Sequence, residues 1–112
     1  SRAANKKRGN RKDQRRERAQ LIQERSRLLK PLRNEMERND NFIDALGEKS
    51  KQTETQLIDA SQQGKTNEIA SLSLQLKNLQ DSIEKAFQKL EEATDEHDRI
   101  QADFDARLAQ EE

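Results

Sequence analysis

Apolar residues recur at alternating steps of three and four along two long stretches of this chain. In the second stretch, ten of the twelve positions so spaced are apolar: Ile69, Leu72, Leu76, Leu79, Ile83, Ala86, Leu90, Ala93, His97, Ile100, Phe104 and Arg107. In the first stretch the same spacing gives eight apolar positions of twelve: Ile22, Arg25, Leu29, Leu32, Met36, Asn39, Ile43, Leu46, Ser50, Thr53, Leu57 and Ala60. A repeat sustained over this length predicts coiled-coil helices.

A polar segment, residues 59–67, separates the two stretches. Gly64 can adopt the left-handed conformation that follows a helix end. Thr66 or Asn67 is expected to cap the next helix, with Glu68 in its first turn. Two helices joined by a tight turn fold back on each other, so we predict an all-α, antiparallel two-helix coiled-coil hairpin. This register places residue 46 opposite residue 83, and residue 43 opposite residue 86.

The remaining boundaries follow from local composition. Residues 1–10 are polar and basic, contain Gly9 and are predicted to form a flexible basic linker. Residues 11–112 form the predicted hairpin, with one helix over about 11–62, a turn over about 62–66 and a second helix over about 67–110. Pro31 lacks an N–H and clashes with the preceding turn, so we expect the first helix to be kinked or broken there. The sequence pattern leaves open whether residues 11–30 are ordered in isolation.

The composition excludes several classes of protein. Charged residues make up 39% of the chain and hydrophobic residues 29%, which is too little apolar bulk for a layered globular core. No run approaches the roughly 18 apolar residues of a membrane span, so no membrane contact is predicted. Cysteine is absent, which rules out disulfides and thiolate metal sites.

A net charge of zero conceals a strong asymmetry. Residues 1–38 hold 14 basic and 5 acidic residues, whereas residues 39–112 hold 8 basic and 17 acidic ones. An antiparallel hairpin brings the basic start beside the acidic end, but a parallel dimer would place like charges together. The charges therefore favour a monomeric hairpin, and a swapped antiparallel dimer with the same contacts remains open.

The basic N-terminal segment is the principal candidate for function. The predicted nucleic-acid-binding residues are Lys6, Lys7, Arg8, Arg11, Lys12, Arg15, Arg16 and Arg18. The segment has no aromatic residue for base stacking, so contact with the phosphate backbone of duplex DNA or folded RNA is expected. In the alternative interpretation, these bases only offset the acidic C-terminal end and keep a linker soluble.

Catalytic chemistry is not predicted for this chain. His97 is the single histidine and has no second metal ligand or nucleophile near it in the pattern. The run Gly64-Lys65-Thr66 lacks the upstream glycine and strand of a phosphate-binding loop. We therefore expect a non-enzymatic chain with no metal and no cofactor of its own.

Three features together resemble a known family. They are the run RKDQRR at residues 11–16, the run PLRNEM at residues 31–36, and a polar turn followed by a long heptad helix. This arrangement resembles the C-terminal coiled-coil extension of ABC-F ATP-binding cassette proteins, in particular the Uup-like and YheS-like branches. The turn, rich in Gln and Ser, departs from that pattern.

The resemblance implies a cytoplasmic parent ATPase whose cassettes, outside this chain, use ATP and magnesium. It also implies DNA binding or action on the ribosome in translation, with ribosomal RNA as a partner and the basic helix as the contact surface. Two alternatives differ from this one. A structural coiled coil would mediate protein–protein interaction or dimerisation, and an arm of another translation factor or a synthetase would prefer RNA.

Overall fold

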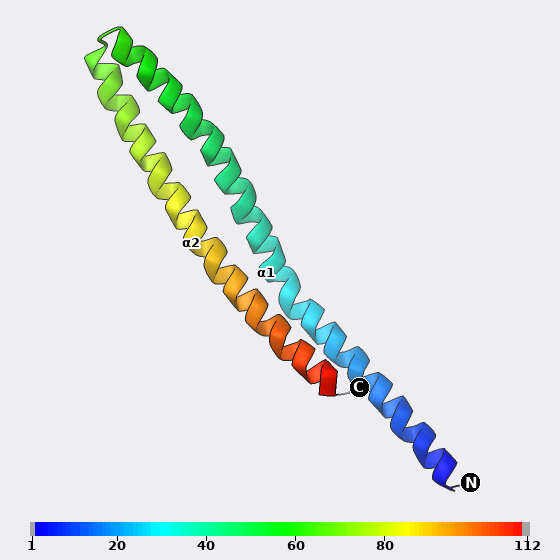
Figure 1. Cartoon of the computed structure of the whole chain (residues 1–112). Helices are drawn as coiled ribbons and strands as arrows, with labels where there is room; N and C mark the ends of the chain where they lie inside the picture. Colours follow the sequence, from blue (N-terminus) through cyan, green and yellow to red (C-terminus); the bar gives the residue numbers. More distant parts are fainter. Residues whose placement is uncertain (1, 111–112) are drawn as a thin grey trace. The chain divides into compact units, whose positions relative to one another are not determined.

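The chain forms a helical hairpin. The structure is a computed structural model that describes residues 2–110; Ser1, at the start of the predicted linker, and Glu111 and Glu112, at the end of the predicted hairpin domain, lie outside the described residues. Helix α1 spans Arg2–Gln62 and helix α2 spans Thr66–Gln110, and residues 2–110 contain no strand (Figure 1). The predicted all-α hairpin is confirmed. Helix α1 ends at the predicted residue, 62, and helix α2 begins one residue before the predicted residue, 67.

Helix α1 begins earlier than expected. Residues 2–10, which were predicted as a flexible linker, form its first turns. Ala3, Ala4 and the Lys and Arg residues that follow are good helix formers, so the segment is locally suited to this conformation. Gly9 is unfavourable by about 1 kcal/mol relative to Ala, which is too little to end a helix on its own. The cations of this segment are therefore carried on a helix.

Pro31 does not break helix α1, which is continuous across it. The proline is exposed, and the neighbouring Leu29 and Leu32 face α2, with Leu29 only 3% exposed. Packing on both sides of the proline holds the helical path despite the missing N–H donor. Of the two predicted outcomes, a break is wrong.

The turn closes α1 with a glycine in the left-handed region. Gly64 has a φ of 66°, and its N–H donates to the carbonyl of Ser61 at 3.3 Å. The next N–H, of Lys65, donates to the carbonyl of Ala60 at 3.0 Å, which completes a Schellman motif. The carbonyl of Lys65 then accepts the N–H of Ile69 at 3.0 Å, so Lys65 occupies the N-cap position predicted for Thr66 or Asn67.

The chain divides into two compact units. The turn unit comprises Glu35–Ala93, and the terminal unit combines Ser1–Asn34 with Thr94–Glu112. We call the positions spaced by three and four the seam. In the turn unit every predicted seam position is buried or half-buried, and the most buried are Thr53, Ala60, Ala86 and Ala93. Two polar residues of the seam bond to their own helix: Thr53 Oγ1 donates to the carbonyl of Lys49 at 2.8 Å, and Asn39 Nδ2 donates to that of Glu35 at 3.0 Å.

The terminal unit departs from the predicted seam at two positions. Ile22 is 39% exposed and Leu21 is half-buried in its place, while Leu108 is 6% exposed and Arg107 lies outside the seam. The seam here takes two consecutive steps of four, through residues 21, 25 and 29 on α1 and residues 100, 104 and 108 on α2. A strict heptad averages 3.5 residues per turn and drifts around a straight helix, which has 3.6. Two consecutive steps of four offset this drift, so the apolar positions stay on the side of the helix that faces its partner.

Candidate nucleic-acid interface

Seven of the eight predicted phosphate-binding residues are exposed on α1. They are Lys6, Lys7, Arg8, Arg11, Lys12, Arg15 and Arg16. Within residues 2–110 none of these seven side chains forms an ion pair or a hydrogen bond. Their charges are therefore available to an external anion.

Six of these cations lie in two parallel rows. Lys7, Arg11 and Arg15 form one row, and Arg8, Lys12 and Arg16 form the other, with a step of four residues in each. Residues four apart are surface neighbours on a helix, about 6 Å apart along its axis. We name these six residues the basic stripe. It covers about 14 Å of the axis on one side of α1.

The other two predicted residues lie apart from the basic stripe. Lys6 falls on the opposite side of the helix, in line with Asp13 and Glu17. Arg18 is half-buried, and its Nη1 donates to the backbone carbonyl of Leu108 at 3.3 Å. The structure thus groups six of the eight residues on one side of α1. The sequence prediction could not distinguish these six from Lys6 and Arg18, because it assigned residues 1–10 to a linker.

Contacts between the basic helix and the acidic part of α2 involve other residues. Arg25 Nη1 lies 2.8 Å from Asp105 Oδ1, and Arg18 contacts Leu108 as described. Both arginines lie C-terminal to the basic stripe, one and two heptads beyond Arg11. Within residues 2–110, these two arginines therefore make the contacts to the acidic part of α2, and the basic stripe makes none.

Three further arginines in the terminal unit pair along their own helices. The Arg27 guanidinium hydrogen-bonds Glu24 and lowers the pKa of that carboxyl below its ordinary value, and Arg99 does the same to the pKa of Glu96. On α2, Arg107 lies 3.7 Å from Asp103 and 4.9 Å from the ring centroid of Phe104. Each of these exposed arginines is thus paired with one carboxylate of the chain, whereas the cations of the basic stripe have no such partner within residues 2–110.

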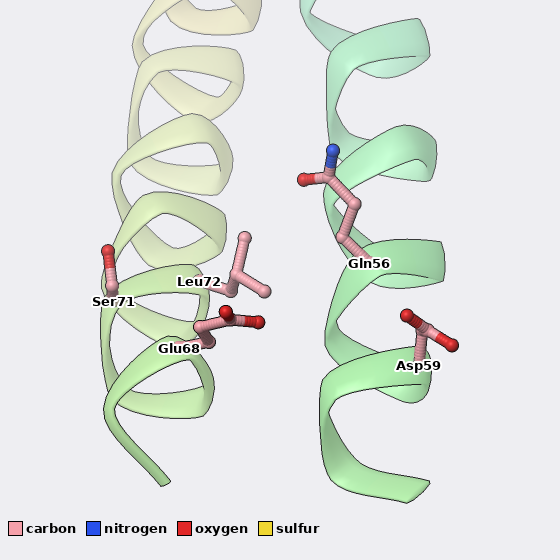
Figure 2. Close-up of a pocket in the computed structure, with 5 residues that line it drawn as sticks. All are labelled: Gln56, Asp59, Glu68, Ser71 and Leu72. Carbon is pink, nitrogen blue, oxygen red and sulfur yellow. The ribbon is translucent and has the colours of Figure 1, made fainter. Parts of the chain in front are cut away.

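The turn unit contains a shallow hollow between its helices, lined by Gln56, Asp59, Glu68, Ser71 and Leu72. In Figure 2, Glu68 and Leu72 of α2 point toward α1, and Gln56 reaches toward α2. The carboxylate of Asp59 accepts hydrogen bonds from Gln63, and Ser71 Oγ lies 3.5 Å from the amide nitrogen of Gln75. The amide of Gln75 is thus the hydrogen-bond partner of this serine.

His97 lies in the seam of the terminal unit. Its side chain is 12% exposed, and Nδ1 lies 3.0 Å from Oδ1 of the adjacent Asp98. Among residues 2–110, no three His, Cys, Asp or Glu side chains are grouped to hold a metal ion. Neither α1 nor α2, over the residues described, is apolar enough along any long stretch to cross a membrane.

Comparison of the chain with protein-family models, curated proteins and solved structures gave no match.

Proposed function

We propose that this chain binds the phosphate backbone of a nucleic-acid duplex through the basic stripe. The observation that carries the proposal is the clustering of six exposed cations on one helix face, without an ion-pair partner within residues 2–110. A cationic face of this kind releases condensed counterions from a nucleic acid when it binds, and this release provides affinity independent of sequence.

The chemistry of the stripe favours duplexes over single strands. Residues 2–18 contain no aromatic side chain, so stacking on unpaired bases contributes nothing to binding. Six arginines and lysines supply point charges and guanidinium donors for phosphate oxygens. Six phosphate contacts correspond to a slope of about −5 in the plot of log K against log salt.

Fluorescence anisotropy across a salt series tests the proposal. The stripe variant replaces Arg11, Lys12, Arg15 and Arg16 with Gln. A control variant replaces the exposed Lys30, Arg33, Arg38 and Lys49 with Gln and removes the same net charge. The stripe variant is expected to lose affinity and to flatten the salt slope by about 3.6, since each contact contributes about 0.9. Equal losses in both variants would mean that net charge alone drives binding.

The same titration separates the candidate ligands. Duplex DNA, duplex RNA and a single strand of equal length form its three arms, and the proposal requires the single strand to bind most weakly. A preference for RNA would favour the ribosomal partner implied by the ABC-F resemblance.

The resemblance supplies the proposed context. The chain would be a non-enzymatic accessory domain of a cytoplasmic ABC-F ATPase, with ATP and magnesium bound in cassettes outside this chain. Sedimentation of the chain with purified ribosomes, compared with the stripe variant, tests that context. Pelleting of both variants to the same extent would contradict a role for the stripe.

A second function is favoured by exposed apolar residues in the turn unit. Phe42 and Phe87 are 52% and 53% exposed, and Ile58 and Leu74 are each 60% exposed. Such residues suit contact with another protein or a second copy of the chain. Analytical ultracentrifugation of the wild type and of Phe42→Ser with Phe87→Ser tests this function. Self-association that is lost in the variant, without duplex binding in the wild type, would establish the structural coiled coil.

A further inference from the structure

We propose that phosphate binding and the helicity of residues 2–17 are thermodynamically coupled, so that each stabilises the other. This inference rests on the proposed function and adds a conformational consequence to it. It derives from the placement of like charges within α1 and from the exposure of this segment.

The basic stripe is electrostatically strained as a helix. Its two rows contain four like-charge pairs at a spacing of four residues: Lys7 with Arg11, Arg11 with Arg15, Arg8 with Lys12, and Lys12 with Arg16. Like charges at this spacing destabilise a helix. Asp13 and Glu17 add a fifth such pair on the other side of the helix.

The same segment has little packing to offset that repulsion. Every residue from 2 to 17 is exposed, whereas the buried residues of the terminal unit begin further along α1, at Leu29. A helical segment of this length without a buried face is marginal in water. Gly9 weakens it further, and no atom lies within 4 Å of the position where a Cβ at Gly9 would stand.

Phosphate groups would remove the main unfavourable contribution. Anions bound along the two rows screen the repulsion between successive cations, so the helical form gains stability on binding. Linkage makes the effect reciprocal, because a variant that is more helical when free has less ordering to complete when it binds. Affinity should therefore follow helix propensity at exposed positions that never touch the ligand.

Two glycine substitutions provide the test. Gly9→Ala adds a methyl group in open space within the segment, and Gly47→Ala does the same in α1 of the turn unit. Gly9→Ala is expected to tighten binding to duplex DNA by up to about fivefold, and Gly47→Ala to leave the affinity unchanged. Ala3→Gly, in the first turn of α1, should weaken binding by a smaller factor.

Helicity is measured separately by circular dichroism with inorganic polyphosphate as the probe, since it adds no signal of its own. The wild type should gain helix on titration, and Gly9→Ala should start higher and gain less. Salt-dependent duplex binding with equal affinities for all three variants and no gain of helix would overturn the coupling and leave the proposed function standing. Failure of the wild type to bind any polyanion at low salt would overturn both.

Discussion

The most deeply buried side chains differ in size between the turn unit and the terminal unit, although both seams also contain half-buried leucine and isoleucine. The most buried residues are Thr53 and three alanines in the first unit, and Leu29, Phe104 and Leu108 in the second. In the terminal unit, two arginines of α1 also contact α2: Arg18 bonds to Leu108, and Arg25 pairs with Asp105. The most buried positions thus hold alanines and a hydroxyl bonded to its own helix in the turn unit, and large apolar side chains in the terminal unit.

The spacing of the seam differs in the same way. The turn unit keeps the alternation of three and four residues throughout, which is the repeat of a left-handed supercoil. The terminal unit inserts two consecutive steps of four on each helix, a local spacing that relaxes the supercoil. We therefore expect substitutions in the two units to have different effects on stability.

The largest effect is expected from a charge in the seam of the turn unit. Ala86→Asp places a carboxylate at a position that is 3% exposed, where desolvation costs several kcal/mol. We expect loss of the folded turn unit, visible as lost protection of its amides in hydrogen exchange. Gln88→Asp, at a nearby exposed position, introduces the same residue into solvent and should keep the protection. Equal protection in both variants would contradict the seam.

Removal of bulk from the terminal unit comes next. Phe104→Ala should cost about 3–5 kcal/mol, because Phe104 is 4% exposed and the seam cannot collapse around its absence. Phe87→Ala removes the same ring from a site that is 53% exposed and should cost less, because less apolar surface is lost from the packing. Chemical denaturation compares the two, and similar midpoints would show that the terminal unit does not depend on its large side chains.

The ion pair between the helices should contribute less. Arg25 and Asp105 are 30% and 51% exposed, so solvent screens their attraction. A double-mutant cycle with Arg25→Gln and Asp105→Asn is expected to give a coupling free energy of about 0.5 kcal/mol. A coupling of several kcal/mol would mean that arginines, and not Phe104, dominate the seam of the terminal unit.

The smallest effect concerns pH in the terminal unit. Because Arg27 and Arg99 lower the pKa of Glu24 and of Glu96, the stabilisation from these pairs is present above the ordinary carboxyl range. It is lost as the pH falls through the lowered pKa values. Carboxyl NMR titration should show both values returning upward in Arg27→Gln and Arg99→Gln. Unchanged titration in the variants would remove the arginines as the cause.

The sequence predicted the turn unit well and the terminal unit less well. In the turn unit the heptad and the reversal at Gly64 could be read from spacing alone. An unchanged heptad predicts Arg107 and Ile22 in the seam, but both are exposed. The choice of Leu108 and Leu21 depends on packing between the two helices, which the period of one helix does not contain.

The basic stripe shows a second limit of sequence reasoning. The eight candidate cations were identifiable from composition, but their grouping required knowledge that residues 2–10 are helical. Gly9 and the density of charge favoured a linker, whereas the alanines and long side chains favoured a helix. Arg18 was separated from the others only by its contact with Leu108, a residue 90 positions away.

The Schellman turn at Gly64 also has a kinetic consequence. It joins the helices through three residues, Gln63 to Lys65, so the first contacts beside it close very short loops at little entropic cost. Contacts of the terminal unit, such as those of Arg25 with Asp105, join residues 80 positions apart. Folding should therefore start at the turn and proceed pair by pair toward the ends, and substitutions near Gly64 should slow folding, whereas those near Phe104 should mainly speed unfolding.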